Sequence, residues 1–148
     1  MSTAYYAVFH ALNARAVQQA FPTTDKEFRQ RVQRWLAHAD AARVCGWITT
    51  IMGTGTYPTP GHIRNLVDPT GGAPQIDQKT LDIADGFLEL YEKRQEADYD
   101  HESVFTRAGT RALITLAVDI VSLIESAASD ESKVFFGLVA MQAQARGR

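Results

Sequence analysis

The chain has 148 residues, a formal net charge of −2 and 45% hydrophobic residues. This composition argues against a disordered chain, and the near-neutral charge excludes a strongly basic surface of the kind that coats nucleic acid. A single cysteine excludes an internal disulfide, and no apolar run reaches the ~20 residues that a membrane-spanning helix needs. We therefore expect one cytoplasmic domain, residues 1–148, that is neither exported nor inserted in a membrane.

Residues 2–20 carry the first strong helical pattern. Apolar residues recur at the spacing of one helix face, at Tyr5, Val8, Phe9, Leu12 and Ala16. A second stripe lies about a quarter-turn away at ~100° per residue and mixes polar with aromatic groups, at Tyr6, His10, Asn13 and Val17. This mixed stripe is suited to face a site or a partner. Proline after Phe21 ends the helix.

A second helix is predicted after Thr24 or Asp25, either of which can cap it. Its apolar residues repeat at helical spacing, at Phe28, Val32, Trp35, Leu36 and Ala39. We expect this helix to run past Ala42 and to weaken at Cys45-Gly46. Its other side carries Arg29, Arg31 and Arg34, which fit a solvated face better than a phosphate-binding surface.

Residues 53–74 hold five of the ten glycines and four of the five prolines. This content predicts a loop of about 20 residues without regular helix, of the kind that tends to be functional or mobile. Gly53-Thr54-Gly55 superficially resembles a phosphate-binding loop, but no Lys-Ser/Thr pair follows and no strand precedes it. We expect His62 and Arg64 to lie in solvent.

Three more helices complete the prediction. One runs from near Asp77 to Arg94, and a final one follows the cap signal at Ser129-Asp130. Between them, Asp100 is the expected N-cap of a helix with a wide apolar stripe, at Phe105, Ala108, Ala112, Leu116, Ile120, Leu123 and Ile124. No segment has a convincing strand pattern. The predicted fold is all-α, a bundle of about five helices with one long Gly/Pro-rich loop.

Arg94 and His101 lie at the predicted junction between two of these helices. As the first helical residue after an Asp100 cap, His101 would stand where free backbone N–H groups favour an anion such as phosphate. The same end of the helix dipole disfavours a charged imidazole, so His101 can accept a proton at neutral pH. Arg94 offers a planar cation that binds phosphate through two bonds and stabilises charge on its oxygens. The pair predicts phosphodiester chemistry.

A purely structural interpretation of this segment is the alternative. On an unbroken helix the two side chains would lie roughly 10 Å apart, too far to grip one phosphate without a break near residues 98–100. Arg94 would then pair with Asp98 four residues later, Tyr99 would pack, and His101 would be an exposed residue of a first helical turn.

Two separated motifs resemble the HEPN domain, Ala4-Tyr5-Tyr6-Ala7-Val8-Phe9-His10-Ala11 and Arg94-Gln95-Glu96-Ala97-Asp98-Tyr99-Asp100. More narrowly they are similar to its small bacterial branch, marked by Tyr-Tyr-Ala-x-Phe-His and Arg-x-x-Ala-Asp-Tyr. The resemblance covers residues 4–124 and implies an antiparallel helix bundle that commonly dimerises. The hallmark of the HEPN domain is an arginine followed, after four to six residues, by a histidine. Arg94 and His101 match this motif.

The resemblance implies a metal-independent endoribonuclease of a toxin–antitoxin or defence system, without a cofactor. Arg94 would stabilise the transition state and His101 would act as acid or base in a dimer cleft, with supporting roles for Asp98, Tyr99, His10 and Tyr6. Asp98 would orient Arg94 or cap a helix, and Tyr99 would stack on a base or fill the bundle. The stripe that holds His10 also fits a histidine that bonds Tyr99 or Asp98 within the fold. The alternatives are a non-catalytic dimer that binds nucleotides or a nucleotidyltransferase antitoxin, and a structural oligomerisation module.

Overall fold

The structure is a computed structural model that describes residues 2–68, 71, 76–99 and 104–146. All regular structure in these residues is α-helical, which confirms the all-α prediction. The helices are α1 (Ser2–Ala20), α2 (Lys26–Gln33), α3 (His38–Ile51), α4 (Gly61–Val67), α5 (Gln78–Tyr99), α6 (Arg107–Ser126) and α7 (Asp130–Arg146). The described part of the chain thus has seven helices where the sequence predicted about five.

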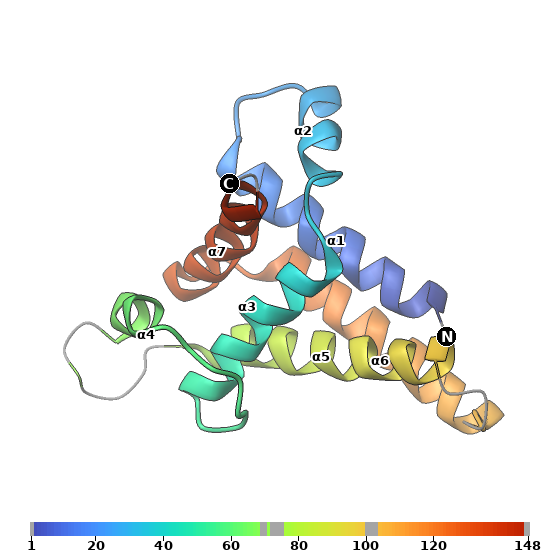
Figure 1. Cartoon of the computed structure of the whole chain (residues 1–148). Helices are drawn as coiled ribbons and strands as arrows, with labels where there is room; N and C mark the ends of the chain where they lie inside the picture. The colour runs from blue at the N-terminus through green and yellow to red at the C-terminus, as the bar shows by residue number, and fades with distance from the viewer. Residues whose placement is uncertain (1, 69–70, 72–75, 100–103, 147–148) are drawn as a thin grey trace.

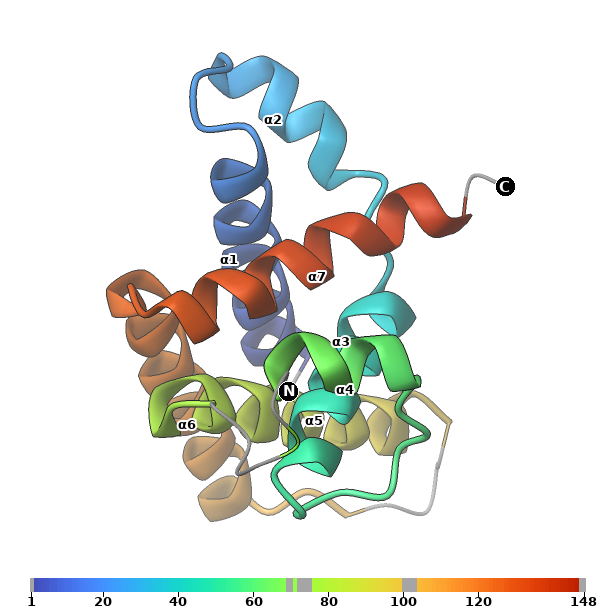
Figure 2. The same ribbon diagram turned by 90° about the vertical axis from the view of Figure 1, so that its left-hand side faces the viewer.

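Helix α1 is central to the fold and packs against α5, α6 and α7 (Figures 1 and 2). Its predicted apolar stripe is buried in the main core, at Tyr5, Val8, Phe9, Leu12 and Ala16. The largest partners of this stripe include Phe87 of α5, Ile124 of α6, and Phe135 and Phe136 of α7. Helix α3 packs against α5 and α7. The periodicity of α1 therefore correctly predicted which of its faces is buried.

Helix α2 stands away from the other helices and packs on the second half of α1 (Figures 1 and 2). Asp25 caps it by accepting a hydrogen bond of 2.7 Å from the backbone N–H of Phe28. A satellite core, separate from the main core, holds α2 to α1; it consists of Val17, Val32 and Leu36, with Phe28 packed against it. Few apolar side chains therefore attach α2 to the rest of the fold.

The prediction of one helix from Asp25 past Ala42 is wrong. Helix α2 ends at Gln33 and α3 begins at His38. The chain turns here because Leu36 packs on the satellite core, while Trp35 from the same predicted stripe remains 62% exposed. Tertiary contacts thus override a local periodicity that fits a continuous helix.

Helix α3 continues through Cys45-Gly46 without the expected weakening. Gly46 is instead required by close packing, since a Cβ there would lie 2.6 Å from Cγ of Tyr57. Trp47 holds the segment that contains Tyr57 and Pro58 by donating a hydrogen bond of 3.1 Å to the carbonyl oxygen of Pro58. The buried Cys45 thiol has a raised pKa, chiefly because burial disfavours the thiolate.

The expectation that residues 53–74 contain no regular helix is also wrong, because α4 lies within them. Ile63 and Val67, four residues apart, are buried in the main core and stabilise this short helix despite the surrounding glycines and prolines. His62 and Arg64 are exposed, as predicted. Residues 69–70 and 72–75 of the same stretch lie outside the described residues.

The later helices differ from the prediction mainly in where they begin. Helix α5 extends to Tyr99, and α6 begins only at Arg107, capped by Thr106, which accepts a 3.0 Å hydrogen bond from the N–H of Gly109. An N-cap for α6 at Asp100 is therefore wrong. The buried face of α6 is also narrower than the predicted stripe: it holds Leu113, Ala117, Ile120 and Ile124, whereas Ala108 and Ala112 are exposed.

The cap predicted for the last helix is confirmed, since Ser129 accepts a 3.1 Å hydrogen bond from the N–H of Ser132. In the part of the chain that the structure describes, no single helix is long and apolar enough to cross a membrane. Residues 107–142 meet that test only as a pair, α6 with most of α7, bent by 106°.

Gly86 lies at a close contact between α5 and α6. A Cβ at this position would lie 2.4 Å from Cδ1 of Ile120. We expect Gly86→Ala to lower the free energy of unfolding by about 1–3 kcal/mol, because the buried Ile120 must move. The matched control is Gly137→Ala in α7, where the nearest atom to the new Cβ is 4.0 Å away. This variant should raise the free energy of unfolding by up to about 1 kcal/mol. Urea unfolding of both variants measures the difference, and equal stabilities would contradict the expected clash.

Candidate functional site

Side chains from three helices meet beside the first half of α1. Tyr5, Tyr6 and His10 come from α1, His38 is the first residue of α3, and Arg94 lies near the end of α5. We call these five residues the Arg94 site. The site exists because α5 packs against α1 and the first residue of α3 contacts Tyr5, which brings together residues that are more than 80 positions apart in the sequence.

Arg94 is a partly buried cation held in a fixed position. Its guanidinium carbon lies 5.2 Å from the ring centre of Tyr5 and 5.3 Å from that of Tyr6, at distances typical of cation–π contacts. Its Nε lies 3.1 Å from Oδ2 of Asp98, an ion pair whose geometry is not that of an aligned hydrogen bond. The side chain is 21% exposed, so Arg94 is only partly shielded from solvent.

The ion pair of Arg94 with Asp98 agrees with the structural interpretation of this segment. The other part of that interpretation, a packed Tyr99, is wrong, because Tyr99 is 81% exposed at the end of α5. His101 and Asp100 lie outside the described residues. The partner histidine predicted for Arg94 therefore stays a prediction.

His38 is the residue of this site that sequence reasoning missed. Its Nδ1 lies 2.7 Å from the hydroxyl oxygen of Tyr5, at hydrogen-bonding distance, and its ring stacks on Phe9 at 3.9 Å between centres. Tyr5 is almost fully buried, and burial raises its pKa although the nearby Arg94 charge acts in the opposite direction. The Tyr5 hydroxyl is thus protonated at neutral pH and fixes the imidazole in place.

The environment of His38 favours its neutral form. Its pKa lies below the ordinary value of 6.5, first because of burial, then because of the charge of Arg94 and of His10. A neutral imidazole at pH 7 can accept a proton, which is the requirement for a general base. The sequence signal for this residue was weak, since His38 falls inside the stretch that was predicted as continuous helix.

His10 and Tyr6 extend the site over the surface of α1. The His10 ring is exposed and stacks with Tyr6 at 6.1 Å between centres, and Tyr6 is 36% exposed. The structural alternative for His10 is a hydrogen bond to Asp98 or Tyr99 within the fold, and no such bond is present among the described residues. Its imidazole therefore remains available to a ligand at the edge of the site.

A prediction about His38 follows from the charge beside it. We expect Arg94→Gln to raise the pKa of His38 toward 6.5, because removing the guanidinium charge makes the imidazolium less costly. The pKa should remain below 6.5, since burial is the larger cause. NMR titration of the imidazole protons measures the shift. Arg43→Gln, a change outside the Arg94 site, should leave the titration of His38 unchanged, and an equal shift there would contradict this assignment.

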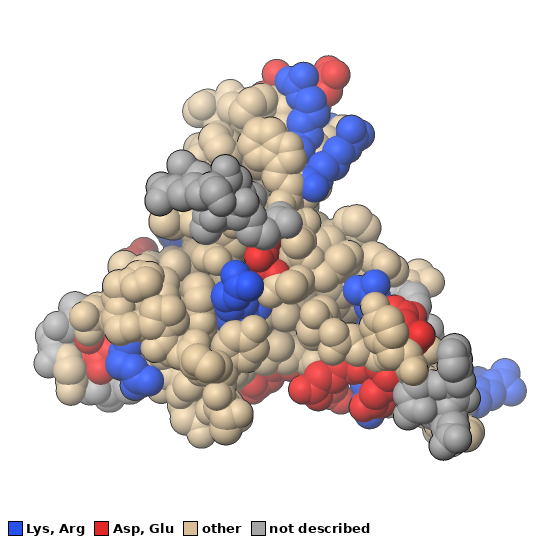
Figure 3. Space-filling view, viewed as in Figure 1, with Lys and Arg blue, Asp and Glu red and all other residues tan. Residues whose placement is uncertain are grey.

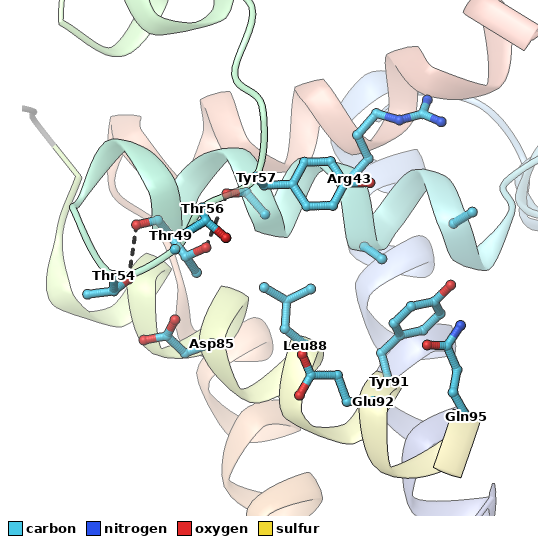
Figure 4. Close-up of a pocket in the computed structure, with 14 residues that line it drawn as sticks. Arg43, Thr49, Thr54, Thr56, Tyr57, Asp85, Leu88, Tyr91, Glu92 and Gln95 are labelled. Carbon is cyan, nitrogen blue, oxygen red and sulfur yellow. Dashed lines mark hydrogen bonds between the residues drawn. The ribbon is translucent and has the colours of Figure 1, made fainter. Parts of the chain in front are cut away.

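A cavity of about 410 Å³, separate from the Arg94 site, lies between α3, residues 54–57 and α5 (Figure 4). Asp85 and Glu92 line it, and the guanidinium of Arg43 points away from both carboxylates (Figure 4). The pKa of Asp85 is raised by burial and by the neighbouring Asp82. Thr54 and Gly55 line this cavity, and its carboxylates would repel a phosphate, so the cavity gives no support to a phosphate-binding loop at Gly53-Thr54-Gly55.

Acidic side chains gather along one side of α5 (Figure 3). The exposed carboxylates recur at helical spacing, at Asp82, Asp85, Glu89 and Glu92. At ~100° per residue, Arg94 lies on roughly the opposite side of the same helix. A polyanion that approaches α5 thus meets repulsion on one side and a cation on the other.

The described residues contain no group of three or more histidine, cysteine or acidic side chains that would hold a metal ion. Comparisons with protein-family models, with curated proteins and with solved structures find no match for this chain. The function must therefore be argued from the Arg94 site itself.

Proposed function

We propose that this chain is a HEPN-like, metal-independent endoribonuclease that acts as a homodimer in a toxin–antitoxin or defence system. The observation that carries the proposal is the Arg94 site. It combines a fixed cation with a neutral imidazole at His38 and an exposed one at His10. Cation and imidazole are the two groups that cleavage of RNA by its own 2′-hydroxyl requires.

In this reaction a base removes the proton of the 2′-hydroxyl, and the freed oxygen attacks the adjacent phosphorus. The bond from phosphorus to the 5′-oxygen breaks, and an acid donates a proton to that leaving oxygen. Arg94 would stabilise the additional negative charge on the phosphate oxygens. His38, held by the Tyr5 hydroxyl, is suited to act as base, while His101 takes the acid or base role that the resemblance implies.

The resemblance also supports the remaining parts of the proposal. It implies an antiparallel bundle and a dimer cleft in which two copies of Arg94 and His101 face one substrate. Helix α6 exposes the apolar side chains Ile114 and Val118, 49% and 62% exposed, which are suited to contact a second copy. Asp98 would orient Arg94, in keeping with their ion pair.

One observation favours the non-catalytic alternative, a dimer that binds nucleotides or a nucleotidyltransferase antitoxin. Tyr99 exposes 81% of its surface at the end of α5, five residues beyond Arg94. An exposed tyrosine hydroxyl on the same helix as the proposed phosphate-binding cation is accessible to modification by such a partner. In this alternative the Arg94 site binds a phosphate without cleaving it.

The decisive experiment is incubation of the purified protein with structured and unstructured RNAs in EDTA, beside His38→Ala and His101→Ala. We expect cleavage that leaves 2′,3′-cyclic phosphate ends and that is strongly reduced in His101→Ala, in His38→Ala, or in both. Circular dichroism shows that each variant is folded, and sedimentation measures the expected dimer. No cleavage by the wild type, or cleavage unaffected by both changes, rejects the ribonuclease. Nucleotide transfer to Tyr99 by a nucleotidyltransferase would then support the alternative.

A further inference from the structure

A cleft of about 550 Å³ separates α1 from α2, next to the Arg94 site. It is lined by Phe9, His10, Asn13, Gln30, Gln33, Arg34 and Leu36. His10 belongs both to this cleft and to the Arg94 site, so the two are continuous along α1. A nucleoside fits within a volume of this size.

Asn13 gives the cleft a buried polar group without a partner. The residue is 2% exposed, and its Oδ1 has no hydrogen-bond partner among the described residues. A buried acceptor without a donor is costly, and such groups are rare in folded proteins. Because the oxygen is shielded, a ligand reaches it only after a small outward movement of α2, which packs on α1 through the small satellite core.

The rest of the cleft is suited to a flat, uncharged ring. Phe9 and Leu36 supply apolar walls, and the exposed His10 imidazole offers a face on which a base can stack. The polar groups that line it include the amides of Asn13, Gln30 and Gln33 and the guanidinium of Arg34, and no carboxylate is among the described residues that line the cleft. Basic side chains of α2 stand beside the notch between this helix and the body of the protein (Figure 3).

From these observations we infer that the α1–α2 cleft is a nucleobase subsite that prefers purines. An amide donates and accepts side by side, which matches the amino group and ring nitrogen on one edge of adenine, and the Arg34 guanidinium matches guanine. The carboxylate that cytosine would require is absent from the described lining. This assignment rests on the proposed function, because it places the base of an RNA whose phosphate lies at Arg94. Adenosine binding is nevertheless measurable without cleavage.

The test is titration of the full chain with adenosine and, separately, with uridine, followed by NMR or calorimetry. We expect saturable adenosine binding that is about tenfold weaker in Asn13→Leu and clearly weaker for uridine. Asn13→Leu should melt at an equal or higher temperature, since it removes an unpaired buried polar group. Asn65→Leu, the same change at an exposed asparagine of α4, is the matched control and should bind like the wild type. If Asn13→Leu does not fold, Gln33→Ala on the opposite wall serves in its place.

Absence of saturable adenosine binding, equal affinity for uridine, or unchanged affinity in the cleft variants would overturn the subsite. The same preparations are assayed for RNA cleavage, which separates this inference from the proposed function. Adenosine binding that depends on Asn13 without RNA cleavage supports the subsite and rejects the ribonuclease. RNA cleavage without adenosine binding rejects only the subsite. Arg94→Ala should leave the affinity for adenosine unchanged, because adenosine carries no phosphate.

Discussion

Arg94→Ala is expected to lower the rate of RNA cleavage by about 10²–10³-fold, the usual loss when one group that stabilises transition-state charge is removed. The guanidinium is the cation of the Arg94 site, held over Tyr5 and Tyr6 with part of its surface exposed. Single-turnover cleavage of a labelled RNA in EDTA measures the effect. Arg94→Lys should retain only part of the activity, because lysine keeps the charge but not the planar fork that binds two oxygens.

Loss of Arg94 should lower stability only modestly. Its ion pair with Asp98 joins residues four apart on a partly exposed helix and contributes about 0.3–0.5 kcal/mol. The contacts with the Tyr5 and Tyr6 rings add about 0.5–1 kcal/mol each. A large fall in melting temperature would therefore mean that the lost activity reflects unfolding. Arg111→Ala, at an exposed arginine of α6, is the control. An equal loss of activity in both variants would assign the effect to general RNA binding.

Phe87→Ala is expected to cause the largest loss of stability, about 3–5 kcal/mol of a total that is typically 5–15 kcal/mol. Phe87 is fully buried, with its ring 5.6 Å from Tyr5 and 6.3 Å from Tyr91 between centres. Removing the ring leaves a cavity in the main core directly behind Tyr5, which positions His38.

Urea unfolding with wild type and Phe21→Ala beside it measures this prediction. Phe21 is 38% exposed and lies outside the main core, so its loss should cost well under half as much. Equal losses would mean that α5 contributes less to the core than its burial implies.

The sequence predicted most reliably the elements whose local pattern agrees with their tertiary contacts. Helix α1 matches its predicted bounds and its predicted buried stripe because one strict periodicity specifies both. The turn after Gln33 was missed because it depends on a tertiary contact, in which Leu36 packs with Val17 and Val32 in the satellite core. The short α4 was missed for the same reason, since burial of Ile63 and Val67 outweighs the local effect of glycine and proline.

The candidate site shows the same division. Arg94, His10 and Tyr6 could be identified because their motifs are contiguous in the sequence. His38 belongs to no such motif. It is the first residue of α3, and it joins the site only because the fold places it against Tyr5. The start of α6 at Arg107 also removes the helix terminus that had been expected to support His101. A residue whose role depends on a tertiary contact leaves no local pattern to find.

The separation of charge on α5 has a consequence for the kinetics of encounter. A net charge of −2 suggests that an RNA meets almost no field, yet the acidic residues and Arg94 occupy opposite sides of this helix. At low ionic strength, such an arrangement turns an approaching strand away from one side and guides it toward the other before any contact forms. Added salt weakens this guidance, because at 0.1 M it limits the range of the electric field to a Debye length of about 10 Å. Salt should therefore change how productively collisions are oriented more than how often they occur.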